Sequence, residues 1–108
     1  MADIALPEPV RLLVAAVNDG DLAGFVGAFT EDGVVEDWGR EFTGHEQIRE
    51  WSERESIGVR QTFDVRSAEE DGDDVMTVID VGGDGYNGLS TFRFTLDGDR
   101  VSRMRITE

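Results

Sequence analysis

The start of the chain carries apolar residues at helical spacing. Val10, Leu13, Val14 and Val17 recur at i, i+3, i+4 and i+7, which is the spacing of one buried helix face. The pattern predicts a helix over residues 7–19. Its two prolines fit only ahead of the helix or in its first turn, because proline lacks the amide N–H that a helix interior needs.

A second helix is predicted directly after the first. Asp21 can accept a hydrogen bond at its start. Four apolar residues follow at the same helical spacing: Leu22, Phe25, Val26 and Phe29. The polar segment 30–33, which ends in glycine, predicts the end of this helix.

The hydrophobic pattern changes twice between residues 33 and 58. Short apolar steps over residues 33–42 predict an extended segment with a turn at residues 38–40. A third helix is expected afterwards, because Thr43 and Glu46 have the spacing of a capping box at a helix start. Its apolar stripe ends before Gly58, which predicts the end of the helix there.

From residue 59 onward the apolar period falls to two, as is typical of strands. Four runs show it, over residues 59–69, 74–81, 89–96 and 100–107. Short clusters of Gly and Asp separate the runs, so they are predicted to form an antiparallel meander. Helices first and strands afterwards predict a single α+β domain over residues 1–108.

Composition excludes several functional classes. Ten arginines and no lysine stand against 24 acidic residues, which gives a formal net charge of −14. Such a surface repels nucleic acids and anionic membranes. The chain has no cysteine, so disulfides, thiolate zinc sites and cysteine nucleophiles are excluded. No signal-peptide pattern or membrane-length apolar run occurs, and a cytoplasmic location is expected.

Four segments in the first half sit at separations typical of one superfamily: Asn-Asp-Gly-Asp at 18–21, Phe-Thr-Glu-Asp-Gly-Val-Val-Glu-Asp at 29–37, Phe-Thr-Gly-His at 42–45 and Ile-Arg-Glu-Trp at 48–51. With them the chain resembles the nuclear transport factor 2-like superfamily, which includes ketosteroid isomerase and small polyketide-cyclase-like (SnoaL-like) proteins. The resemblance implies a cone-shaped fold, with three N-terminal helices packed on a strongly curved antiparallel sheet around an apolar cavity. It also implies a homodimer through the outer sheet face.

Asp37 is the candidate catalytic residue, because its position resembles that of the general base in ketosteroid isomerase. A carboxylate shielded from water suits proton abstraction next to a carbonyl. The expected reaction is an isomerisation or cyclisation, and no metal or organic cofactor is implied, because it would need only acid-base groups and a dry pocket. In the alternative interpretation, Asp37 caps the turn before Gly39 or pairs with an arginine.

The isomerase mechanism also needs donors for the developing oxyanion, and here the resemblance fails. Leu13 occupies the place of the donor tyrosine, and residues 89–92 contain no carboxylate. A steroid isomerase is therefore not expected. A non-catalytic module that binds a small molecule or dimerises is the alternative function, and a purely structural domain with a filled core is the third.

An apolar small molecule is the expected ligand, and six aromatic residues are the candidates to line its pocket: Trp38, Trp51, Phe25, Phe29, Tyr86 and Phe92. The same side chains could simply fill the core. Tyr86 lies in the Gly-rich segment 82–88, which is interpreted as a hairpin loop because it lacks the Gly-Lys-Ser/Thr ending of a phosphate-binding loop.

Each of two further titratable residues has two possible interpretations. His45, the only histidine, is either a surface residue near a helix start or a proton-transfer group. No second histidine or cysteine accompanies it at ligand spacing, so a metal site is not expected. Asp80 interrupts an apolar strand, and either pairs across strands with an arginine on the outer face or enters the cavity as a second acid.

Overall fold

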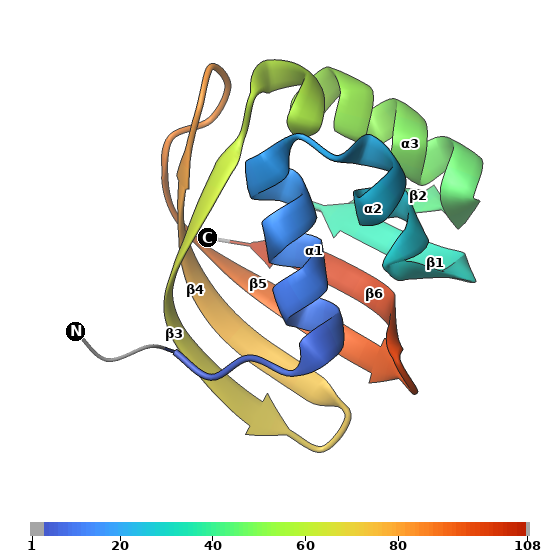
Figure 1. Ribbon diagram of the computed structural model, residues 1–108, viewed down its shortest axis with the longest axis vertical. Helices are drawn as coiled ribbons and strands as arrows, with labels where there is room; N and C mark the ends of the chain where they lie inside the picture. The colour runs from blue at the N-terminus through green and yellow to red at the C-terminus, as the bar shows by residue number, and fades with distance from the viewer. Residues whose placement is uncertain (1–3, 108) are drawn as a thin grey trace.

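The computed structural model describes residues 4–107 (Figure 1). Three helices and a short 3-10 helix lie on the inner side of a six-stranded sheet that curves around α1. The elements in chain order are α1 (Glu8–Asp19), α2 (Leu22–Gly27), β1 (Phe29–Asp37), β2 (Arg40–Thr43), α3 (Gly44–Glu55), η1 (Ile57–Val59), β3 (Thr62–Asp71), β4 (Asp74–Gly82), β5 (Gly88–Asp97) and β6 (Arg100–Thr107). The predicted α+β class and the helices on a curved sheet are confirmed.

The strands follow the order β2-β1-β6-β5-β4-β3 across the sheet. Strands β3 to β6 form the predicted antiparallel meander, and β1 and β2 form a hairpin about the predicted turn. Strands β1 and β6 pair in parallel, with Asp37 opposite Ile106. The first and last strands of the chain are thereby neighbours in the middle of the sheet.

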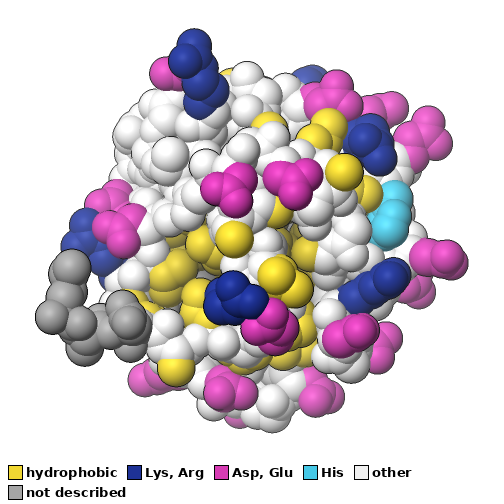
Figure 2. Space-filling model, in the orientation of Figure 1, with side chains coloured by type: hydrophobic (Ala, Val, Ile, Leu, Met, Phe, Trp, Pro, Cys, Tyr) yellow, Lys and Arg dark blue, Asp and Glu magenta, His cyan; other side chains and the backbone are white. Residues whose placement is uncertain are grey.

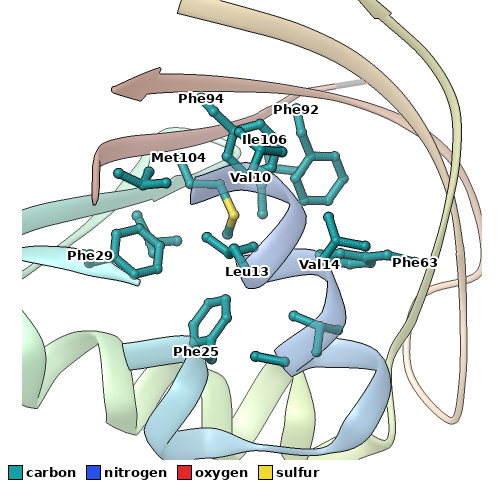
Figure 3. Packing of buried hydrophobic residues seen from close by; sticks show 14 of the residues in the cluster. Val10, Leu13, Val14, Phe25, Phe29, Phe63, Phe92, Phe94, Met104 and Ile106 are labelled. Atoms are coloured by element: carbon teal, nitrogen blue, oxygen red, sulfur yellow. The ribbon is translucent and has the colours of Figure 1, made fainter. Parts of the chain in front are cut away.

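The core lies between the inner sheet face and the helices (Figure 3). The predicted face of α1 is buried, and Leu13 sits near its centre, among Phe25, Phe29 and Met104. Inward residues alternate along β5, where Phe92 and Phe94 are buried and their rings stack with centroids 6.2 Å apart. The period-two pattern therefore identified the buried face of the strand.

The second helix is shorter than predicted. It ends at Gly27, and Phe29 opens β1 opposite Val101 of β6. The amide of Val101 also donates to the carbonyl of Ala28. Pairing with a distant strand outweighs the helical spacing of Phe29, and the polar segment 30–33 becomes an irregular part of β1.

Three predictions concern the ends of other elements, and one of them is confirmed while two are wrong. Asp21 caps α2 as expected, since its Oδ1 accepts from the amide of Gly24 at 3.0 Å. The prediction of a capping box at the start of α3 is wrong, because the Thr43 side chain makes no capping hydrogen bond. Instead, Gln47 Oε1 accepts a hydrogen bond from the Thr43 amide at 2.9 Å. The first strand run begins at Thr62 and not at residue 59, because η1 occupies 57–59.

The outer face of the sheet is bare of helices and carries ion pairs. Asp80 pairs with Arg66 across β3 and β4 at 2.8 Å, while its neighbours Ile79 and Val81 point into the core. The cross-strand interpretation of Asp80 is confirmed, and the cavity interpretation is wrong. No helix in the described part of the chain has the length and apolar character needed to cross a bilayer.

Candidate functional site

A hollow of about 400 Å³ lies at one end of the molecule, where the ends of β1 and β6, the last turn of α3 and the loop between β4 and β5 meet. Figure 1 shows that loop and the end of α3 at the same end of the cone. Its volume exceeds about 300 Å³, the lower limit for typical ligand sites. A completely filled core, the third alternative, does not describe this end of the fold.

Register across three strands builds the floor of the hollow. Asp37 on β1 faces Ile106 on β6, and Ile106 faces Phe92 on β5. All three side chains are on the inner face, and Trp51 of α3 lies across from them. An acid therefore stands at one side of an apolar surface.

Asp37 is 8% exposed, and its two oxygens have different surroundings. Oδ2 accepts a hydrogen bond from Arg40 Nη2 at 2.6 Å and another from Trp51 Nε1 at 3.1 Å. Oδ1 accepts none from a described residue. The carboxylate is thus held in place through one oxygen, and the other remains available to a ligand.

Arg40 connects Asp37 to the end of α3. Its guanidinium donates to both carboxylate oxygens of Glu55, at 2.7 and 3.1 Å, and lies 5.6 Å from the ring centroid of Phe42. The hydrogen bonds to Glu55, together with the charges of Glu55 and Asp37, raise the pKa of Arg40 above its usual value. Arg40 therefore remains a cation shared by two carboxylates at the mouth of the hollow.

Trp38 occupies an unusual backbone position beside Asp37. Its φ is +52°, and that of Gly39 is +86°, so both central residues of the β1–β2 turn are left-handed. Such turns favour Asn or Gly at the first position, because a larger side chain is strained there. The Trp38 side chain is half-exposed and lines the hollow.

Tyr86 reaches the hollow from the loop between β4 and β5. Its side chain is half-exposed, and its hydroxyl donates to the carbonyl of Leu89 at 3.3 Å. Asn87 Nδ2 donates to the carbonyls of Gly83 and Gly85, which fixes the shape of the loop. The loop joins two antiparallel strands, as its interpretation as a hairpin connection predicted.

The structure brings most of the predicted site residues together and sets two apart. Asp37, Trp38, Trp51, Tyr86 and Phe92 all line the hollow. Phe25 and Phe29, expected there as well, are fully buried and do not line it. The Phe25 ring packs edge-on against Phe29 and stacks on Trp51, so these two rings form the support behind Trp51.

Sequence reasoning missed several polar residues of the hollow. Arg40, Arg54 and Glu55 lie at its mouth, and Gln61 and Ser90 lie further along its lining. Arg54 and Glu55 follow Trp51 by three and four residues, so helical spacing could have identified them. Ser90 lies two residues before Phe92, and strand alternation could have placed it on the inner face.

His45 lies elsewhere, half-buried at the start of α3, with Nε2 3.0 Å from the carbonyl oxygen of Phe29. It does not line the hollow, so the proton-transfer interpretation has no support there, and the residue near a helix start is half-buried and not fully on the surface as expected. Within residues 4–107, no three His, Cys, Asp or Glu side chains are grouped in a way that could hold a metal ion.

A second hollow, of about 430 Å³, lies between α1, α2 and the turn that joins β5 to β6. Its lining consists of small and aliphatic residues with a few charges, and it contains no aromatic side chain. Leu12 of α1 is 48% exposed beside it. Figure 2 shows hydrophobic side chains among the charged ones over the middle of this face, where α1 lies. The hollow beside Asp37 combines a buried carboxylate with aromatic side chains and is therefore the candidate functional site.

Comparison with known proteins gives matches over most of the chain. Residues 10–104 match the family model of the SnoaL-like domain. Among solved structures, the chain is similar to a putative polyketide cyclase from Sinorhizobium meliloti. The two share 25% sequence identity with a TM-score of 0.83, over 94% of this chain and 95% of that one. A search of curated proteins finds no match.

Two further structures share the fold at lower identity. A putative ketosteroid isomerase from Kribbella flavida has 14% identity and a TM-score of 0.79, over 93% of this chain and 74% of that one. A computationally designed 17-OHP binder has 13% identity and a TM-score of 0.83, over 93% and 87%. Since the family model spans nearly the whole sequence, this chain belongs to the SnoaL-like family of the nuclear transport factor 2-like superfamily.

Proposed function

We propose that the protein binds an apolar small molecule in the hollow beside Asp37 and moves a proton on a carbon next to its carbonyl group. The observation that carries this proposal is the asymmetry of Asp37. Arg40 and Trp51 both donate to Oδ2, and Oδ1 has no partner among residues 4–107. An oriented carboxylate with one open oxygen beside an apolar floor is suited to act as a base.

The reaction can be written with side chains alone. Oδ1 takes the proton as the C–H bond breaks, and the electron pair moves to the carbonyl oxygen to give an enolate. In isomerisation Asp37 returns the proton to a different carbon. In cyclisation the enolate carbon attacks a second carbonyl, and the resulting alkoxide oxygen takes the proton back from Asp37. When Asp37 becomes neutral, Arg40 keeps its pair with Glu55, so the step leaves no unpaired cation.

The similar structures are consistent with a small-molecule role. One is described as a putative polyketide cyclase and another as a 17-OHP binder. Polyketide chemistry proceeds through carbons next to carbonyls, which is the chemistry that a carboxylate base serves. The proposal takes only this chemical class from the comparison, because the ligand depends on the shape of the hollow in this chain.

Binding without chemistry is the second candidate function, and one observation favours it. Oδ2 of Asp37 joins the end of β1 to α3 through Trp51 and Arg40, so the carboxylate has a structural role that requires no reaction. The two candidates differ in one measurable property, which is the rate of proton exchange on a bound ketone.

The experiment follows exchange of the hydrogens next to the carbonyl of 2-tetralone in D₂O by NMR. The native protein is expected to accelerate exchange over buffer, and Asp37→Asn to lose the acceleration by about 100-fold or more. Binding of 2-tetralone, followed by tryptophan fluorescence, should change only a few-fold.

Asp80→Asn is the matched control, because it makes the same chemical change on the outer sheet face. It should exchange 2-tetralone at the native rate. Equal exchange by native protein and Asp37→Asn would remove Asp37 from the mechanism. Binding of 2-tetralone without any acceleration would favour the second candidate.

A further inference from the structure

Aromatic side chains are concentrated around the hollow beside Asp37. Both tryptophans and the only tyrosine of the chain line it, together with Phe92. Trp38 and Tyr86 are half-exposed, whereas Trp51 and Phe92 are buried. Aromatic surface that stays exposed and gathers at one hollow is a sign of a binding site.

These four side chains come from four separate parts of the fold: the β1–β2 turn, the β4–β5 loop, α3 and β5. The two buried rings are held in place by their neighbours, since Phe25 stacks on Trp51 and Phe94 stacks on Phe92. Rings that approach one space from several sides form a cage. Such an aromatic cage suits a compact, rounded ligand group more than a flat one.

The chemistry of this lining favours a positively charged group. The face of an aromatic ring carries partial negative charge, and it attracts a cation that lies within about 6 Å of the ring centroid. Asp37 adds a buried carboxylate, whose Oδ1 has no hydrogen-bond partner among residues 4–107. The rings and the carboxylate would both repel an anion, and a hydrocarbon group would leave Oδ1 unsatisfied.

The arginines of the hollow do not reverse this preference. Arg40 and Arg54 are matched in number by the carboxylates of Asp37 and Glu55, which line the same hollow. Arg40 also donates to both of these carboxylates. The whole chain has a formal net charge of −14, so its long-range field draws cations toward the molecule and repels anions.

We infer that the hollow binds a quaternary ammonium ligand, with its methyl groups against the aromatic rings and its charge beside Asp37 Oδ1. A primary ammonium has three N–H donors that all need acceptors, whereas a quaternary ammonium has none and packs on rings through its methyl groups. The inference goes beyond the proposed function, because this ligand needs no carbonyl group and undergoes no reaction. A bound ammonium covers Oδ1 and should therefore compete with a ketone for the hollow.

The test compares choline with 3,3-dimethylbutan-1-ol, which has the same shape but carries a carbon in place of the charged nitrogen. Titrations followed by tryptophan fluorescence give the two dissociation constants, and proton NMR follows the methyl signal of choline. The native protein should bind choline about 3- to 30-fold more tightly than the alcohol. The methyl signal should move upfield on binding, because the methyl groups lie over aromatic rings.

Tyr86→Leu removes one ring of the cage and leaves the net charge unchanged, so it separates the cage from the general attraction of cations to an acidic protein. Its affinity for choline should fall about 2- to 5-fold, with little change for the alcohol. Tyr86→Phe is the matched control, because it keeps the ring and removes only the hydroxyl. It should keep the native preference for choline.

Three results would overturn the inference: equal binding of the two probes by the native protein, no binding of either probe, or the full native preference for choline in Tyr86→Leu. None of them bears on the exchange of 2-tetralone, which tests the proposed function separately. A native protein that prefers choline but does not accelerate that exchange would support the ammonium site and contradict the proposed reaction.

Discussion

At the scale of single residues, the carboxylates of Asp37 and Glu55 share the Arg40 cation. Arg40 reaches Asp37 at 2.6 Å and Glu55 at 2.7 Å through the same Nη2. The Asp37 side chain is far more buried than that of Arg40, so the pair joins the interior of the hollow to its rim. Solvent screening weakens the rim contacts, and their value lies in orientation more than in stability.

Trp38 is the residue whose backbone is least suited to its side chain. Trp38→Ala and Trp38→Asn both remove the indole, but asparagine tolerates a left-handed φ better than alanine does. The free energy of unfolding of Trp38→Asn is therefore expected to be about 0.5–1 kcal/mol larger than that of Trp38→Ala. Urea denaturation of the two variants measures the difference.

The same two variants should bind 2-tetralone equally weakly, because both lack the indole. Equal stabilities would contradict the strain assigned to residue 38. Native affinity in both variants would show that the indole does not contact the ligand.

Much of the site could be predicted from residue type and position. Asp37, Trp38, Trp51, Tyr86 and Phe92 were expected together, because they are acidic or aromatic and adjoin recognisable segments. Ser90 was missed because a serine on a strand is common and carries no signal of its own.

At the scale of elements, the start of β4 is tied to β5 by one carboxylate. Thr95 Oγ1 donates to Asp74 Oδ1 at 2.8 Å, and Arg93 Nη1 donates to Oδ2. The hydrogen bond from Thr95, followed by that from Arg93 and its charge, lowers the pKa of Asp74 below its ordinary value of 3.8. A native pKa below the unfolded one means that this contribution to stability is present above pH 3.8 and is lost as the pH falls through the native pKa.

Thr95→Val should therefore destabilise the protein mainly when Asp74 is ionised. We expect a loss of about 0.5–1 kcal/mol near pH 7 that shrinks as the pH falls below 3.8. Thr91→Val is the control on the same strand and face, since Thr91 makes no side-chain hydrogen bond to a described residue. Urea denaturation at several pH values measures both variants. A loss that is independent of pH in Thr95→Val would contradict the role of Asp74.

Elements with strong local signals could be predicted, and those decided by distant partners could not. The four apolar positions of α1 and the alternation in β4 and β5 appear in the sequence as in the structure. The end of α2 depends on Phe29 facing Val101, which lies more than seventy residues away. The parallel pairing of β1 with β6 also joins residues that are far apart in the sequence, and no local pattern indicates it.

At the scale of the whole molecule, acidic charge is spread widely and the outer sheet face is an exception. Acidic side chains dominate the helix-bearing side in Figure 2. On the outer face, Arg66, Arg93, Arg103 and Arg105 pair with carboxylates, so the charge there is largely balanced. The apolar side chain of Leu89 is 59% exposed on the same face. The homodimer expected from the sequence stays a prediction, and the paired charges reduce the repulsion that a second copy would meet on this face.

Salt should control that association. Two copies with a net charge of −14 each repel one another, and raising NaCl from about 0.05 to about 0.5 M screens the repulsion. Sedimentation velocity should show a larger dimer fraction at high salt in the native protein. Val78→Glu, which adds a charge to the half-buried middle of the outer face, should remain a monomer at both salt concentrations. A native monomer under both conditions would contradict a dimer through this face.

The parallel pairing of the first strand with the last has a consequence during synthesis. Until the ribosome has released β6, one edge of β1 has no neighbouring strand, and the part of the floor that Ile106 gives to the hollow does not exist. An unpaired edge is a template for pairing with other chains. Chains truncated before residue 100 should therefore aggregate more readily than the full chain, which light scattering of the two purified proteins would measure.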